Sequence, residues 1–482
     1  MTETVNFYDA GVWKSILLIA ILLSSLLLAH ILKSWKPVKQ SLIPNAVIGG
    51  IIILIISGIC YAVTGDYLFN QDWLSENGSG MNVLEILTYH CLGVGFIALT
   101  LRDSDPAESK KVRTSEIINS GMLTVSTYLV QGILGIAVTI IAACFINGFV
   151  PGSGLLLCFG FGQGTGQALT QGVNFDTAAG TGEVYANIGL TFAASGFLIA
   201  SLGGVIILNI LRRKNMLPKY DIKKFNREDK LAEEAMKAEE MESNESVDKL
   251  SIQFALIFLC YVIAYGFMFV LGKLISGMIG TVFGFNFIFG VLAAVLVKWI
   301  LKLLKKRGMI KKTYNNTFLL NRISGFAFDL MIVSGICAIQ IHLLTSYIWL
   351  IVLIVALGAA GTFIYIWFVC RNIFPEYRHE QFFAFFGMLT GTASTGVILL
   401  REIDPRLESK ASENLVYQNI PAIVFALPVL FITSQFYKSY DAVMSIPHAA
   451  ILTAVVIVYF IILNIILFRS KIFKRKNRNA GK

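Results

Sequence analysis

Residues 151–172 read PGSGLLLCFGFGQGTGQALTQG, and residues 382–400 read FFAFFGMLTGTASTGVILL. Each segment begins with apolar residues and ends with small and hydroxylated ones, and the first contains seven glycines. Neither pattern is typical of a full membrane crossing. Non-helical backbone at membrane depth is tolerated only where protein or a water-filled cavity surrounds it. We therefore predict that each segment is a re-entrant hairpin, which enters the membrane and leaves on the same side.

The rest of the 482-residue chain consists mostly of apolar runs. Hydrophobic residues make up 56% of the chain and charged residues only 15%, whereas soluble domains have about 25% charged residues. Runs of about 20 apolar residues are long enough to cross a bilayer as helices. We predict an all-α polytopic membrane protein with eleven transmembrane helices at 12–32, 43–64, 83–101, 115–147, 183–211, 251–272, 282–303, 318–341, 345–370, 413–434 and 447–468.

The basic residues predict the orientation of these helices. One set of loops offers only Lys14, Lys273 and Lys438, and the alternate loops and the C-terminal tail hold nearly all the other basic residues. Loops rich in Lys and Arg stay in the cytoplasm, which predicts an external N-terminus and a cytoplasmic C-terminus. The net charge of +10 does not indicate a nucleic-acid partner, because the basic residues lie in short loops between apolar runs.

The two halves of the chain resemble each other. Gly160-x3-Gly164-Thr165 in the first half matches Gly387-x3-Gly391-Thr392 in the second, and VYANI at 184–188 matches VYQNI at 416–420. Two spans before each hairpin lies an acidic residue, Glu85 or Asp329. A repeat of five spans reverses its orientation because five is odd. Inverted repeats with Gly-rich interruptions at corresponding positions are typical of secondary transporters.

The same reasoning divides the chain into four parts. Residues 1–211 form the first membrane repeat and residues 251–437 the second. Between them lies a charged cytoplasmic linker at 212–250, with ten basic and ten acidic residues. Residues 438–482 form an additional C-terminal helix and a basic tail.

The glycines of the hairpins permit an unwound backbone. Freed N–H groups can then hold an anion, while carbonyl and hydroxyl oxygens can hold a hard cation such as Na⁺. An acid at a helix centre is costly and is a functional candidate, although a paired structural acid is the alternative. The predicted substrate-binding residues are Gln163, Gly164, Thr165, Gly166, Asn187, Thr392, Ser394, Thr395 and Asn419. The predicted Na⁺ ligands are Asp329, Thr390, Gly391 and Thr392.

Four stretches resemble the glutamate:sodium symporter (ESS) family. They are Ile43-Pro44-x2-Val47-x-Gly49-Gly50, Gly162-Gln163-Gly164-Thr165-Gly166, the helix from Glu183 to Gly204, and Thr390-Gly391-Thr392-Ala393-Ser394. Gln163 stands where the family has His, and Ala393 stands at its Pro. The resemblance implies a Na⁺-coupled carrier with two inverted five-helix halves, sites at the re-entrant tips and a place in the plasma membrane of a bacterium.

These observations favour a secondary active transporter that couples Na⁺ to a small anionic or zwitterionic substrate, such as glutamate, another carboxylate or an amino acid. Membrane lipid is the expected surrounding. The sequence does not decide between a monomer and a homodimer. An ion channel built on the Gly-rich loops is the alternative, since backbone carbonyls can replace the hydration shell of a cation. Packing by small residues alone is the simplest reading of the glycines. An integral membrane enzyme is disfavoured, because the spans contain no His/Asp/Glu cluster and no Ser–His–acid arrangement.

Overall fold

The computed structural model describes residues 10–75, 78–102, 114–217, 249–274, 279–309, 314–404 and 409–469. Within these ranges every regular element is a helix. Ten of the helices are long and apolar enough to cross a membrane. The protein is therefore a multi-pass membrane protein, as the composition predicts.

The helices before the linker have the bounds α1 Ala10–Leu32, α2 Lys36–Gln40, α3 Asn45–Thr64, η1 Leu68–Asn70, α4 Gly80–Leu101, α5 Thr114–Ala143, η3 Ser153–Leu155, α6 Leu156–Ala179, α7 Val184–Leu198, η4 Ile199–Gly203 and α8 Gly204–Arg213. Those after it have the bounds α10 Lys249–Leu274, α11 Ile279–Gly284, α12 Asn286–Lys306, α13 Thr317–Cys337, α14 Ile341–Leu344, η5 Thr345–Tyr347, α15 Ile348–Ile373, η6 Pro375–Tyr377, α16 Arg378–Thr390, α17 Ala393–Arg401, α18 Lys410–Tyr417, α19 Asn419–Phe436, α20 Tyr440–Met444 and α21 Ile446–Leu467. Most of the predicted linker, at 218–248, and the tail from 470 on lie outside the described residues.

Ten of the eleven predicted spans coincide with the ten spanning helices. The other, at 413–434, is a pair of helices, Lys410–Tyr417 and Pro421–Phe436, bent by 45°. Pro421 accounts for the break, because its ring clashes with the carbonyl four residues earlier and it has no N–H to donate. Counting the bent pair as one span gives eleven.

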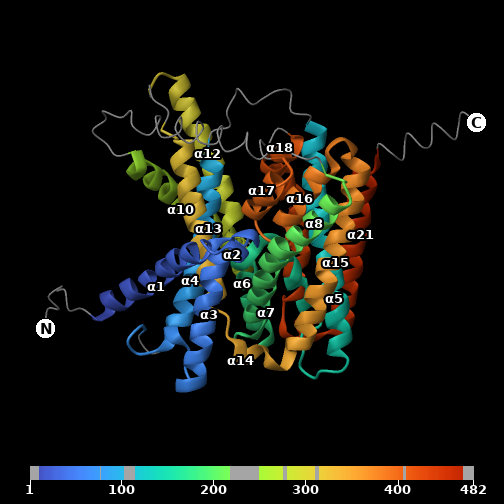
Figure 1. Cartoon of the computed structure of the whole chain (residues 1–482). Helices are drawn as coiled ribbons and strands as arrows, with labels where there is room; N and C mark the ends of the chain where they lie inside the picture. The colour runs from blue at the N-terminus through green and yellow to red at the C-terminus, as the bar shows by residue number, and fades with distance from the viewer. Residues whose placement is uncertain are drawn as a thin grey trace, which may run out of the picture.

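The helices form two bundles, and each bundle takes helices from both halves of the chain. In the first, α4 packs on α13, α3 on α13 and α12 on α4, while α1 and α10 cover α3 and α12. In the second, α5 packs on α15, α19 and α21, and α6 packs on α7. Figure 1 shows α10, α12 and α13 on one side of the molecule and α5, α15 and α21 on the other. The contacts of the first bundle are therefore reciprocal between the two halves.

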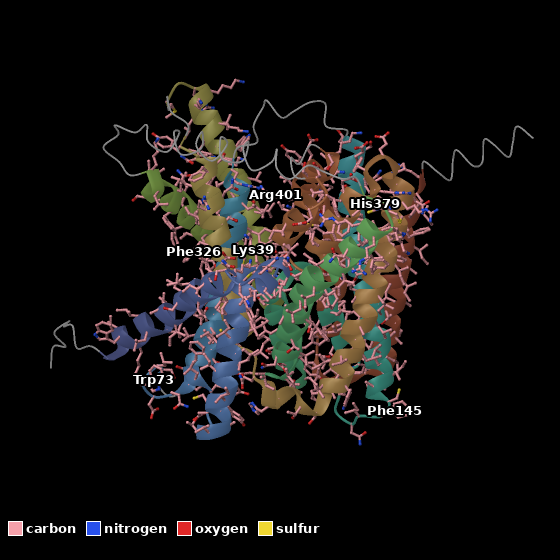
Figure 2. The ribbon with its side chains drawn as sticks, in the orientation of Figure 1. Lys39, Trp73, Phe145, Phe326, His379 and Arg401 are labelled. Atoms are coloured by element: carbon pink, nitrogen blue, oxygen red, sulfur yellow. The ribbon has the colours of Figure 1, made fainter. Side chains whose placement is uncertain are left out.

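The two ends of the molecule differ in the segments that they contain. In Figure 2, Trp73 and Phe145 lie at one end, and His379 and Arg401 lie toward the other. The first pair belongs to loops with few basic residues, whereas His379 lies near the start of α16 and Arg401 at the end of α17, close in sequence to Arg371 and Arg378. The fold thus separates these two pairs of positions, and Lys39, from another basic segment, lies between them in Figure 2.

Candidate functional site

The first Gly-rich segment reverses direction at Gly164. This residue has φ 79° and ψ −172° and interrupts α6, in a region of backbone conformation that is essentially restricted to glycine. The ring of Tyr185 contacts both Phe149, which precedes α6, and Phe175, near its end. A straight helix of 24 residues would separate its ends by about 36 Å. The chain before and after Gly164 therefore forms two arms of a helical hairpin, defined here as the first hairpin, residues 151–179.

The second segment reverses direction at Gly391 and Thr392, between α16 and α17. A β-carbon placed on Gly396 would lie 2.4 Å from the carbonyl oxygen of Ala384, and one on Gly387 would lie 2.7 Å from the α-carbon of Gly396. Contacts this close between residues on either side of the turn require that α17 folds back along α16. This second hairpin comprises residues 378–401, and its arms touch through bare backbone because glycine has no side chain.

The tips of the two hairpins meet on α7 and the π-helical turn η4. A β-carbon placed on Gly196 would lie 2.3 Å from the carbonyl oxygen of Thr390 and 3.1 Å from the ring of Phe161. One turn further along, Ala200 lies against Gly391. Both tips are therefore packed on the stretch between Gly196 and Ala200. A π-helical turn is often found at a functional site.

The bases of the hairpins lie at opposite ends of the same helical run. The first base contacts Tyr185, at the beginning of α7. At the end of α8, Arg212 forms an ion pair of 3.1 Å with Glu402, directly after the second hairpin. The run from Val184 to Arg213 is a single candidate span. The hairpins consequently point toward each other and meet near its middle.

The predicted residues of the first tip are closely packed. Gly164, Thr165 and Gly166 are buried, whereas Gln163 is half-buried. The hydroxyl of Thr165 donates a hydrogen bond of 3.1 Å to the carbonyl oxygen of Met331 in α13. The side chain of Gln163 makes no hydrogen bond to another described residue, which leaves its amide group available to a ligand. The first tip is thus attached to the other bundle.

The predicted residues of the second tip bond mainly to one another. Thr392 caps α17 by accepting a hydrogen bond of 3.3 Å from the N–H of Thr395, and the two hydroxyls lie 3.2 Å apart. The hydroxyl of Thr390 donates to the carbonyl oxygen of Phe386 within α16. The side chain of Ser394 lies outside the described residues. Hydroxyl and carbonyl oxygens are therefore concentrated at this tip, as a site for a hard cation requires.

The two predicted asparagines hold local structure. Asn187 donates to the carbonyl oxygen of Glu183 and accepts from the backbone N–H of Gln340. Asn419 accepts from the side chain of Gln418 and donates to the carbonyl oxygen of Val416. Both amides lie in the helices after the hairpins, and these bonds fix the beginnings of those helices.

The two predicted acids lie in different surroundings. Asp329 is exposed, and so is Phe326, three residues before it in α13 and labelled in Figure 2. Within the described residues it has no hydrogen bond or ion pair with the second tip. Its negative charge acts on Lys33: burial lowers the pKa of Lys33, and the charge of Asp329 raises it. Glu85 is half-buried, and its Oε1 has no hydrogen-bond partner among the described residues. The structure therefore does not group Asp329 with Thr390, Gly391 and Thr392.

Two side chains of α5 contact the tips and were not predicted from the sequence. Tyr128 donates a hydrogen bond of 3.1 Å to the carbonyl oxygen of Gly162 at the first tip. Gln131 donates to the carbonyl oxygen of Leu389 at the second tip (2.9 Å) and to Thr362 of α15 (3.0 Å). A lone Gln in an apolar helix is a signal that could have identified Gln131. Its Oε1 is buried and without a partner among the described residues.

Asp176 is a third residue that the sequence did not reveal. Its carboxylate accepts hydrogen bonds from the backbone N–H groups of Tyr185 and Ala186 and from the hydroxyl of Thr181. Carboxylates at a helix N-terminus are favoured by the free N–H groups and the helix dipole. Asp176 therefore fastens the end of the first hairpin to the beginning of α7.

Neither a protein-family model nor a curated protein matches the chain. Among the described residues, no group of three or more His, Cys, Asp or Glu side chains could hold a metal ion. The oxygen atoms that the tips do present belong to Thr hydroxyls and to backbone carbonyls.

Proposed function

We propose that the protein is a secondary active transporter that carries a small carboxylate or amino acid together with Na⁺ by alternating access. The meeting of two oppositely directed hairpin tips on α7 and η4 carries this proposal. Gly-rich interruptions at corresponding positions of two inverted repeats are typical of the binding sites of secondary transporters. Glutamate is the first substrate to test, because of the resemblance to the ESS family.

The proposed architecture is a pair of inverted five-helix repeats with two re-entrant hairpins. Reciprocal packing supports it: α3 contacts α13 as α12 contacts α4, and α1 contacts α3 as α10 contacts α12. A two-fold relation that exchanges the halves generates these pairs of contacts. It also exchanges the two hairpins, which point in opposite directions.

The second tip is the proposed Na⁺ site, with Thr390, Gly391 and Thr392 as ligands. Its hydroxyl and carbonyl oxygens are the ligands that hard cations prefer. The substrate would lie beside it, within reach of Gln163 and the backbone of the first tip at Gly164 and Gly166. A carboxylate there would accept hydrogen bonds from N–H groups that the break in α6 frees from the helix.

The proposed setting is the plasma membrane of a bacterium, with the N-terminus outside and the C-terminus in the cytoplasm. The concentration of Lys and Arg in alternate loops of the sequence supports this orientation. Cysteines introduced at positions 78 and 440 should then react with an impermeant reagent from outside. Those at 230 and 478 should react only after permeabilisation.

Uptake of labelled glutamate, other carboxylates and amino acids into proteoliposomes tests the proposal, with and without an inward Na⁺ gradient. A carrier gives saturable, Na⁺-dependent uptake and accelerated exchange when unlabelled substrate is present inside the vesicles. A channel gives conductance that follows the ion gradient without exchange. The absence of Na⁺-dependent uptake across the whole panel would overturn the proposal.

A further inference from the structure

Three amide side chains of α6 lie against α11, and a fourth, Asn286, begins α12 two residues after Gly284, the end of α11. Gln167 and Gln171 of α6 and Asn286 of α12 are buried, each with at most 1% of its surface exposed, and Asn174 is half-buried. Within the described part of the chain, each has one polar atom without a hydrogen-bond partner: Oε1 of Gln167, Nε2 of Gln171, Nδ2 of Asn174 and Oδ1 of Asn286. Buried polar groups are normally paired, so a group of four open ones requires an explanation.

In three of these side chains the other polar atom of the amide group forms a hydrogen bond. Gln167 donates to the carbonyl oxygen of Gly284 (3.1 Å), and Asn286 donates to that of Tyr89 (3.0 Å). Because a carbonyl can only accept, the open atoms of Gln167 and Asn286 must be oxygens. Tyr437 donates to Oε1 of Gln171 (2.9 Å), which leaves its NH₂ group open. The cluster therefore offers both acceptors and donors, at fixed positions.

The amides of α6 form a row along one face of the helix. Residues 167, 171 and 174 follow the i, i+4, i+7 spacing that places side chains above one another. Gln163 lies at the first tip, just before the reversal at Gly164, and so belongs to the other arm. The row therefore leads from the tip toward the base of the first hairpin.

Gly284, the last residue of α11, covers this row. A β-carbon placed on it would lie 3.2 Å from Nδ2 of Asn174, 3.2 Å from the methyl group of Thr170 and 3.6 Å from Nε2 of Gln171. Any larger side chain at 284 would press against the row. Glycine is thus the residue that lets α11 lie directly on it.

We propose that the amide row of Gln167, Gln171 and Asn174 lines the path by which an α-amino acid zwitterion passes between the outer solution and the hairpin tips, and that Asn286, next to the covering segment, adds a further acceptor. The open N–H groups suit the carboxylate of such a solute, and the open carbonyl oxygens suit its ammonium group. In this structure α11 closes the path at Gly284. The inference rests on the proposed function and narrows its substrate class to amino acids.

Thiol labelling tests the path independently of transport. Cysteine is introduced at Gln167 or Gln171, in a variant whose seven native cysteines are replaced, and cells are treated from outside with an impermeant maleimide. Ala168 is the matched control, because it is equally buried but faces Gly189 of α7. We expect labelling at 167 and 171 at least about tenfold faster than at 168, and slowed by Na⁺ with L-glutamate. Equal rates at the three positions, or labelling only after permeabilisation, would overturn the path.

Uptake by the variants Gln171→Leu and Gly284→Leu provides the second test. Both should reduce amino-acid uptake at least about tenfold while size-exclusion profiles stay unchanged, and Gln171→Asn should recover part of it. Gly266→Ala is the control, because a β-carbon there meets nothing within 4 Å. Wild-type uptake distinguishes the two failures. If wild type and Gln171→Leu take up amino acids equally well, the path is wrong and the proposed function stands. If the row is labelled but the wild type takes up nothing, the proposed function is wrong, although the row is still reached from outside.

Discussion

The first and second hairpins differ in what holds their tips. At the first tip Gly164, Thr165 and Gly166 are all buried, and Thr165 bonds to Met331 of the other bundle. At the second tip Thr392 is half-buried, and Ala393 is exposed. The bonds of the second tip stay within its own hairpin or reach Gln131 of α5 in the same bundle.

This difference indicates which hairpin moves more easily. Local opening costs least where few buried contacts must be broken. The first tip cannot leave its place without separating the two bundles, whereas the second tip can open within one bundle. We therefore expect the second hairpin to act as the more mobile of the two.

Replacing Gly164 with Ala should have the largest effect. The backbone there adopts φ 79° and ψ −172°, and holding a non-glycine residue in this region costs about 1–3 kcal/mol. At about 1.4 kcal/mol per tenfold change, uptake should fall by about 5- to 150-fold. Uptake into proteoliposomes and thermal unfolding of the purified variant measure the loss.

Gly148 provides the control for Gly164. It also has a positive φ, of 77°, and a β-carbon there meets nothing within 4 Å, but it lies outside both hairpins. Gly148→Ala should lower thermal stability slightly and leave uptake intact. Equal losses of uptake in the two variants would mean that the tip has no special role.

The sequence predicted the ten spanning helices because apolar length depends on local composition. Its glycines predicted interruptions in two further segments, and Gly164 interrupts α6 while Gly391 follows the end of α16. That these segments re-enter the membrane stays a prediction. The contacts of Gln131 and Tyr128 with the tips could not be predicted. They depend on how α5 packs against segments that are about 30 to 260 residues away along the chain, and one sequence contains no record of such pairs.

The surroundings of the two acids could not be predicted either. Asp329 was placed in the site because an acid inside an apolar run is rare, but the sequence does not say which face of α13 packs inward. The structure places Asp329 on the exposed face and Glu85 in a half-buried position. The break at Pro421 was missed because hydropathy alone treats Pro as one more residue of a span.

Gln131→Leu should loosen the second tip more than the first. The change leaves the carbonyl oxygen of Leu389 without its partner, and an unpaired buried group costs about 1–3 kcal/mol. With Ala393→Cys as a reporter, thiol labelling at 393 should become about 5- to 150-fold faster. Tyr128→Phe is the matched variant at the first tip and should leave this rate nearly unchanged. Similar acceleration by both variants would show that the tips open together.

The threonines at the tips should respond differently to the same change. Thr392→Val removes an N-cap, at a cost of about 0.5–2 kcal/mol, and Thr392→Ser should restore it. Thr165→Val keeps the packing on Gly335 and loses one hydrogen bond to Met331, worth about 0.5–1.5 kcal/mol. The effects at the two positions are measured by the dependence of uptake on Na⁺ and substrate concentration in the four Val and Ser variants. If Val is tolerated at both positions with wild-type affinities, neither hydroxyl is a ligand.

Asp329→Asn should have the smallest effect. It tests the sequence-based prediction that Asp329 binds Na⁺ against the position that the structure gives it, away from the second tip. A carboxylate that ligates Na⁺ would, when replaced, raise the Na⁺ concentration for half-maximal uptake by at least about tenfold. The carboxylate has no bond to the second tip among the described residues, and its charge acts instead on Lys33. We therefore expect less than about a fivefold change, and a similar one in Lys33→Gln. A large Na⁺ effect in Asp329→Asn alone would mean that α13 turns this face toward the second tip during the transport cycle.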